Sequence, residues 1–396
     1  MTIEGRKLEQ TKKSEDVMTL YRDWMKAALA LAKKGAGFVA PNPMVGALVI
    51  DETEVIGRGY HERCGEGHAE VNAVADALTK RTSLAGMTMV VTLEPCSHYG
   101  KTPPCAELIL KHGIKKVIIA MKDPNPLVAG RGTRLLENSG VEVVVGIMEE
   151  EARQLNEAFI HHILKKTPYV VMKTAMTLDG KIATTTGDSK WVSGSASRKY
   201  VHRLRQELQG IMVGVNTVII DDPQLTTRLE EKLISHPVPI IVDSKGRMPL
   251  ESKLLTAGVH QKVIIATTEA MPKAKEEALQ ACGCTIIKTA TVEGRVDLNE
   301  LMQILGAEGI NSILLEGGGT LNDSALKSGI VQKILSFIAP KMIGGSTAKT
   351  PVAGTGIPYM ADAILLKDMG VEQIGEDILV TAYIDQREEP TCLQDS

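Results

Sequence analysis

Aromatic side chains are scarce in this sequence of 396 residues, which has two Trp, seven Tyr and three Phe. Proteins that bind single-stranded nucleic acid stack bases on aromatic rings, so such a function is poorly provided for. The charge is nearly balanced, with 45 basic and 48 acidic residues and a net charge of −3. Because the chain has no overall basic field to collect a polyanion, we expect a small charged substrate and no nucleic-acid partner.

Membrane and export signals are missing too. The longest apolar runs have the length of a strand, well below the ~18 residues that a membrane span needs. The first residues mix charges without the apolar core of a signal peptide. Six cysteines are too few for a disulfide scaffold in a chain this long. We expect a cytoplasmic protein without a membrane partner, in which grouped thiols indicate a metal site or catalysis.

The length suits two domains, at roughly 150 residues for each. Apolar residues at helical spacing predict a first helix over residues 21–34, and the polar residues 1–17 are expected to be a mobile extension. Strands then alternate with helices in both halves, which predicts α/β folds with helices on both faces of a sheet. A helix over residues 149–166 precedes the boundary. The expected domains are residues 18–166 and 167–388.

Candidate metal ligands stand at the ends of predicted elements in the first half. His68 begins a helix, Cys96 follows an apolar strand, and Cys105 begins the next helix after two prolines. One imidazole and two thiolates can hold Zn²⁺ with a fourth position open, which is the arrangement of catalytic zinc sites. Glu70 is the carboxylate placed to move protons there. Cys64, four residues before His68, is the alternative ligand, and a lone His or Cys is otherwise core filling.

The order of these residues, His-x-Glu and then Pro-Cys with a second Cys, resembles the signature of zinc nucleobase deaminases. Eight residues separate Cys96 from Cys105, where that signature has two. This long insert, with residues 40–46 (APNPMVG) and 57–61 (GRGYH), resembles the deaminase half of the bifunctional deaminase/reductase family of riboflavin biosynthesis. The resemblance covers about residues 18–386 and continues through the second half in the family's order.

The resemblance implies a cytidine-deaminase-like α/β/α domain that acts on a small phosphoribosylaminopyrimidine. It makes His68, Cys96 and Cys105 the zinc ligands and Glu70 the catalytic residue, which carries a proton to the ring nitrogen and then to ammonia. The residues that it implies for the substrate pocket are Asn42, His61, His98 and Lys101. On the residues alone, Asn42 is equally well a turn residue and Lys101 a solvated loop charge.

The second half lacks the common dinucleotide motif, because no Gly-x-Gly-x-x-Gly follows a strand. A strand instead runs into three glycines in residues 314–320 (LLEGGGT). Such a turn lets backbone N–H groups approach a phosphate at the start of a helix, although a glycine turn after a strand is more often only a connection. Further polar residues are expected at strand ends and loops, in the segments 173–183, 189–191, 202–205 and 217–228.

These segments resemble the reductase half of the same family, a dihydrofolate-reductase-like α/β domain that takes hydride from NADPH. The residues that the resemblance implies for NADPH binding are Ala175, Trp191, Thr217, Asp221, Ser244, Gly318 and Gly319. Those that it implies for the sugar-phosphate substrate are Ser189, Arg205, Leu225, Arg228 and Glu316. Taken singly, Arg205 is equally well a solvated helix charge, Trp191 a core residue and Asp221 part of a turn.

The combined expectation is an enzyme that uses Zn²⁺ and NADPH, deaminates a pyrimidine and then reduces its ribosyl chain. One alternative is a tRNA-type base deaminase, which needs a basic stripe and stacking aromatics that this chain lacks. Another is a structural zinc protein or sensor whose second half binds a nucleotide without turnover. Two-domain metabolic enzymes are often symmetric assemblies, so we also expect a homo-oligomer, of unspecified size.

Overall fold

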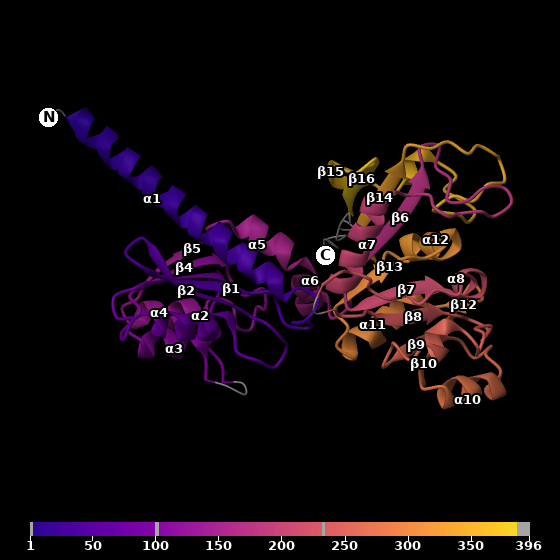
Figure 1. Cartoon of the computed structure of the whole chain (residues 1–396), viewed down its shortest axis with the longest axis horizontal. Coiled ribbons are helices and arrows are strands. Elements are labelled where there is room, and N and C mark those ends of the chain that lie inside the picture. Colours follow the sequence, from indigo (N-terminus) through magenta and orange to yellow (C-terminus); the bar gives the residue numbers. More distant parts are fainter. Residues whose placement is uncertain (1–2, 100–102, 232–233, 386–396) are drawn as a thin grey trace, which may run out of the picture. The chain divides into compact units, whose positions relative to one another are not determined.

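The computed structural model describes residues 3–99, 103–231 and 234–385 (Figure 1). The chain divides between Lys165 and Lys166 into two compact units. Each unit has a large sheet and buries apolar residues against it. In the described part of the chain, no helix combines the length and the apolar character that crossing a bilayer requires.

The first unit is built on a five-stranded sheet in the order β2-β1-β3-β4-β5. β1 pairs antiparallel with β2 and β3, whereas β3, β4 and β5 are parallel. β1 and β3 are buried along nearly their whole length, as strands covered on both faces are. The strands are β1 (Gly46–Asp51), β2 (Glu54–Tyr60), β3 (Thr88–Leu93), β4 (Lys116–Met121) and β5 (Glu142–Val145).

Helices cover both faces of this sheet (Figure 1). α1 and α5 pack on one face, and α2, α3 and α4 pack on the other. The helical elements are α1 (Ile3–Ala32), the 3-10 turn η1 (Lys33–Gly35), α2 (Ala69–Leu78), α3 (Cys105–Lys111), α4 (Arg131–Asn138), α5 (Glu149–Leu155) and α6 (Glu157–Lys165).

Two of these helices correct the expectation from the sequence. α1 begins at Ile3, so the described part of the extension expected over residues 1–17 is a helix. Glu, Lys and Gln are good helix formers, so these residues continue the helix upstream. The helix expected over residues 149–166 is interrupted at Asn156. The buried Asn156 amide instead pairs with Met44, whose N–H donates to Oδ1 (2.8 Å) and whose carbonyl accepts from Nδ2 (3.0 Å).

The second unit contains a nine-stranded sheet in the order β10-β9-β8-β7-β13-β6-β14-β16-β15. Neighbouring strands from β10 to β14 are parallel, and β16 and β15 continue the sheet antiparallel. The strands are β6 (Tyr169–Thr177), β7 (Gly210–Gly214), β8 (Val238–Val242), β9 (Val263–Thr267), β10 (Cys284–Lys288), β13 (Ser312–Leu315), β14 (Val331–Ala339), β15 (Leu366–Ile374) and β16 (Asp377–Ile384), with a separate hairpin of β11 (Thr291–Val292) and β12 (Arg295–Val296).

Side chains along the strands of this sheet alternate between two apolar cores. On β7, Met212 joins a core that contains Leu301, whereas Ile211 and Val213 join a core that contains Val218. Helices therefore cover both faces, as expected. The helical elements are α7 (Ser195–Glu207), α8 (Val215–Asp221), α9 (Lys253–Thr256), α10 (Lys273–Ala281), α11 (Leu298–Ala307), α12 (Gly319–Lys327) and the 3-10 turn η2 (Met360–Asp362).

Candidate active sites

Close packing of α2 on β2 positions the N-terminus of α2 in the first unit. A Cβ atom added to Gly59 would lie 2.2 Å from the backbone N of Ala73 and 2.4 Å from the backbone O of Ala69. Only glycine allows the helix to approach the strand this closely. His68 is the N-cap residue of α2 and Glu70 lies in its first turn, so both side chains are fixed by this contact.

The three expected zinc ligands come together in one cluster. Cys96 follows β3 and Cys105 is the first residue of α3. The Cys105 Sγ lies 3.3 Å and the Cys96 Sγ 3.7 Å from the Nδ1 of His68, and the three ligand atoms are all within 4.8 Å of one another. One nitrogen and two sulfur donors converging in this way suit Zn²⁺. Cys64, the alternative ligand, is exposed and lies outside this cluster.

The hydrogen bond between the two thiols divides their acidity, because it lowers the pKa of Cys96 and raises that of Cys105. Hydrogen bonding from Cys105 lowers the pKa of the Cys96 thiol, and the backbone N–H of Cys105 also donates to the Cys96 Sγ (3.3 Å). Burial, together with the negative charge of Cys96, raises the pKa of Glu70 to about 7. A buried carboxyl with such a pKa can accept and release a proton near neutral pH.

The residues expected in the pyrimidine pocket differ in how far they are exposed to solvent. The ring of His61 is buried, and its centre lies 5.6 Å from the centre of the His68 ring. Its Nδ1 lies 3.1 Å from the carbonyl oxygen of Gly67. Asn42 Nδ2 donates to His61 Nε2 (3.2 Å), and burial lowers the pKa of His61, so the ring is held neutral. His98 is exposed. Lys101 lies outside the described residues.

The buried amide of Asn156 was not predicted as part of this site. Its two hydrogen bonds to Met44 fix the segment that carries Asn42, so Asn156 helps to hold Asn42 in position. Asn156 gives no signal in the sequence, because its partner is 112 residues away.

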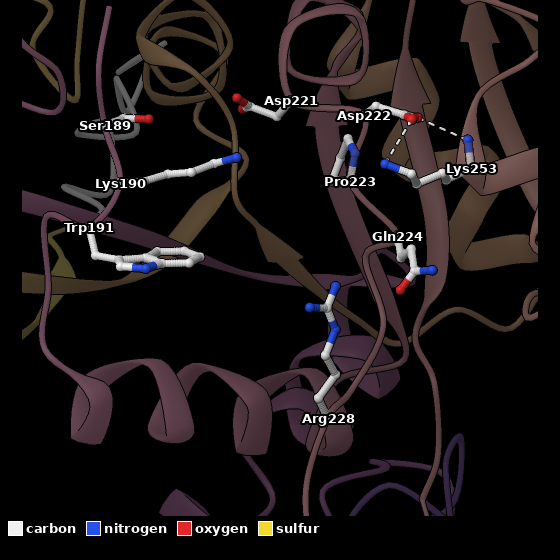
Figure 2. A pocket seen from close by; sticks show the side chains of 9 residues that line it. All are labelled: Ser189, Lys190, Trp191, Asp221, Asp222, Pro223, Gln224, Arg228 and Lys253. Carbon is white, nitrogen blue, oxygen red and sulfur yellow. Dashed lines mark hydrogen bonds and ion pairs between the residues drawn. The ribbon is translucent and has the colours of Figure 1, made fainter.

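A cavity of about 550 Å³ lies in the second unit, and Figure 2 shows Trp191 and Arg228 extending toward it from different segments. Four of its lining residues were expected at the reductase site: Ser189, Trp191, Asp221 and Arg228. Of the others, Lys253 was not expected, whereas four lie in the segments 189–191 and 217–228 that were expected near this site: Lys190, Asp222, Pro223 and Gln224. Positive side chains at the cavity suit the anionic parts of a cofactor or substrate.

Two cations contact Trp191, one at its indole ring and one at its backbone. The guanidinium of Arg198 lies 4.7 Å from the centre of its indole ring, within the range of a cation–π contact. The ammonium of Lys341 donates to the backbone carbonyls of Trp191 (2.6 Å) and Val192 (3.0 Å). The indole is nevertheless 62% exposed, so it is a wall residue of the cavity and not a core residue.

Arg205 and Glu316, both expected to contact substrate, pair with each other. The fork of Arg205 binds the Glu316 carboxylate at two points, and Lys173 lies 2.8 Å from the same carboxylate. Arg205 also donates to the carbonyl of Thr226 (3.1 Å), next to Leu225. Leu225 itself is 3% exposed, so it is buried beside the cavity wall.

The remaining residues expected at NADPH follow strands of the parallel sheet. Thr217 lies on α8 after β7, Ser244 follows β8, and Gly318 and Gly319 follow β13, while Ala175 lies on β6. The carboxyl edge of a parallel sheet is where nucleotides bind in α/β folds. A Cβ atom on Gly318 would meet nothing within 4 Å. Its backbone thus borders open space at the N-terminus of α12.

Both halves match known families. Residues 18–121 match the cytidine and deoxycytidylate deaminase zinc-binding region, and residues 168–380 match the RibD C-terminal domain. The riboflavin biosynthesis protein RibD of Actinobacillus pleuropneumoniae is 47% identical over 90% of this chain and 94% of its own length. That of Bacillus amyloliquefaciens is 43% identical over 91% and 95%.

Solved structures agree with these matches. RibD of Acinetobacter baumannii (form 1) is similar with a TM-score of 0.82 and 36% identity, covering 93% of this chain and all of that one. The deaminase/reductase of Thermotoga maritima is similar with a TM-score of 0.79 and 35% identity, covering 93% and 99%. These likenesses extend through both units.

The fold and the matches define a two-domain enzyme that combines a zinc-dependent deaminase with a reductase. The expected α/β fold class and the expected cofactors, Zn²⁺ and NADPH, are confirmed. The chain belongs to the RibD family of riboflavin biosynthesis proteins. The roles of single residues and the exact domain limits stay predictions.

Proposed function

We propose that this chain catalyses two consecutive reactions, namely deamination of a diaminohydroxyphosphoribosylaminopyrimidine and NADPH-dependent reduction of the resulting 5-amino-6-(5-phosphoribosylamino)uracil. Both names are those of the activities of the similar Thermotoga maritima protein. The observation that carries the proposal is the partly buried cluster of His68, Cys96 and Cys105 beside the buried Glu70, on one chain with a reductase domain.

The deaminase chemistry follows from the positions of these side chains. Zn²⁺ held by His68, Cys96 and Cys105 would supply the acidity that activates water at neutral pH. Glu70 takes one proton from the attacking water and passes it to the ring nitrogen. It then takes the second proton from the hydroxyl left on the ring carbon and passes it to the amino group, which departs as ammonia. The buried His61, fixed by Asn42 and by the carbonyl of Gly67, packs edge-on against the ring of His68 and so holds that zinc ligand in one orientation.

The reductase chemistry needs mainly alignment, because NADPH supplies the hydride. The exposed indole of Trp191 forms a flat wall for the cofactor, and the glycines before α12 admit a phosphate of NADPH. Arg228 points into the same cavity and can fork to the phosphate of the sugar chain. The aldehyde or imine form of the ribose then accepts hydride at C1.

A homo-oligomer in the cytoplasm is also part of the proposal. β15 is an edge strand whose residues are exposed from Leu366 to Gln373, and its Met369 and Val371 side chains are 63% and 68% exposed. Such an apolar edge favours a second strand. Sedimentation velocity tests it: Val371→Lys should dissociate the assembly, and a monomeric wild-type protein would contradict it.

The five described cysteines are unpaired, which suits a reducing compartment.

The function is tested by incubating the purified protein with the diaminopyrimidine phosphate, with and without NADPH. Released ammonia and the loss of NADPH absorbance are followed together. We expect ammonia in both reactions and NADPH oxidation only after deamination has begun. Ammonia release without any oxidation of NADPH would reject the bifunctional proposal.

A further inference from the structure

All three histidines of the second unit contact one short segment of backbone, residues 224–228. The Nε2 of His260 lies 2.7 Å from the carbonyl of Gln224. The Nδ1 of His236 accepts from the N–H of Thr227 (3.3 Å), and the Nδ1 of His202 accepts from the N–H of Arg228 (3.2 Å). The three rings come from three places in the fold: α7, the loop before β8 and the loop before β9.

This segment has no regular secondary structure, so its backbone polar groups need partners from side chains. Leu225 is 3% exposed and has a φ of 50°, a left-handed conformation that is unfavourable for a leucine and persists only where the surroundings hold it. Arg205 holds the carbonyl of Thr226 in addition. Side chains thus bind the backbone at four of five consecutive residues.

The segment also forms one wall of the cavity, through Gln224 and Arg228 (Figure 2). Arg228 Nε donates to the Oγ1 of Thr226 (3.2 Å), so the direction of its guanidinium depends on where the segment lies. A shift of the backbone here would move the cation away from a bound phosphate. Residues that hold the segment therefore act on substrate binding without touching the substrate.

We propose that His202, His236 and His260 are positioning residues of the reductase site, which hold residues 224–228 so that Arg228 faces the substrate phosphate. The proposal rests on the reductase function proposed above. None of the three was predicted to contact a ligand, and none lines the cavity.

The chemistry of the rings makes this support dependent on pH. An Nδ1 that accepts an N–H must be unprotonated, so protonation of His202 ends its contact and opposes the N–H of Arg228 with another donor. His260 can donate from Nε2 in either form, so its contact survives. Arg205, Arg228, Glu316 and the Thr226 carbonyl face His202, and the rings of His236 and His260 face each other at 6.2 Å.

The surroundings favour the neutral form of two half-buried rings, His202 and His260. Burial lowers the pKa of His202, and Arg205 and Arg228 lower it further, against Glu316 and the carbonyl of Thr226, which raise it. Burial also lowers the pKa of His260. Acid consequently breaks the contact from His202 and leaves the contact from His260.

Two variants at one position test the proposal. His236→Ala removes the acceptor, whereas His236→Asn places an amide oxygen near the position of Nδ1 and cannot titrate. With pre-deaminated substrate, we expect His236→Ala to raise KM about tenfold, with kcat changed less, as the loss of one hydrogen bond implies. We expect His236→Asn to restore KM, and we expect His202→Asn to weaken the acid-side fall in kcat/KM as well.

Failures of the two proposals look different. If the wild-type protein does not reduce the substrate, the proposed function fails. If it does, but His236→Ala leaves KM unchanged or His236→Asn is as damaging as His236→Ala, the positioning role is overturned. The same pair of substitutions at His202 repeats the test. Deamination by each variant should stay at the wild-type rate, and a loss there would indicate general misfolding and overturn a local role.

Discussion

Arg205 on α7 and Glu316 after β13 form a two-point ion pair across 111 residues of sequence, with distances of 2.7 Å from Nε to Oε1 and 3.1 Å from Nη2 to Oε2. Their side chains are only 15% and 9% exposed. Lys173 on β6 adds a second cation to the carboxylate. The triad ties a helix to two neighbouring strands beside the reductase cavity, so it stabilises the second unit whether or not substrate is bound.

Glu316→Gln should destabilise the second unit, because it leaves Arg205 and Lys173 buried without their anion. We expect a loss of about 3 kcal/mol in the free energy of unfolding at pH 7. Urea titrations of both proteins over a range of pH measure it.

The pH dependence has a definite sign. The two cations hold the pKa of Glu316 far below its usual range. A carboxylate with a lowered folded-state pKa stabilises the fold above its ordinary pKa of 4.5 and loses this effect as pH falls below it. The difference between wild type and Glu316→Gln should be constant above about pH 6 and shrink below about pH 4.5. A difference that grows in acid would contradict the ion-pair assignment.

Zinc binding should depend on Cys96 and Cys105 and not on Cys64. Cys105→Ser removes a soft ligand from the cluster, so we expect the purified variant to hold little zinc and to lose deamination. Cys64→Ser is the matched control, because Cys64 is exposed and outside the cluster. Metal analysis after gel filtration should find about one zinc per chain in wild type and in this control. Zinc loss from Cys64→Ser, with retention in Cys105→Ser, would reassign the ligand.

Trp191→Ala should raise the KM for NADPH about tenfold, because a flat aromatic wall is worth about 1 kcal/mol or more against a bound ring. Trp191→Phe keeps an aromatic face and should be affected less. Steady-state rates of NADPH oxidation with pre-deaminated substrate measure both. Equal KM values for the alanine variant and wild type would show that the indole does not contact the cofactor.

Residues at the ends of elements were predictable from the sequence, whereas partners distant along the chain were not. His68, Cys96 and Cys105 are marked by strand ends and helix starts, and the structure brings them together. The pairing of Arg205 with Glu316, and of Asn156 with Met44, depends on sheet order, which the spacing of apolar residues does not contain. For the same reason the resemblance suggested a substrate role for Arg205 without revealing its ion pair.

Local propensity also misled in places. The charged residues 1–17 looked like an extension because they lack apolar periodicity, yet their described part continues α1. β15 was not predicted, since nearly all of its residues are exposed and no buried face gives it an alternating pattern. Neighbouring strands or binding partners determine where an exposed strand of this kind forms, and the burial of its own side chains does not.

Glu70→Gln tests the central claim, that one chain performs deamination first and reduction second. The amide keeps the shape of the buried side chain but cannot accept the proton. We expect this variant to release no ammonia and to oxidise no NADPH with the diaminopyrimidine phosphate, while it oxidises NADPH at the wild-type rate with the pre-deaminated uracil substrate. NADPH oxidation with the diamino substrate, in the absence of ammonia release, would contradict the proposed order.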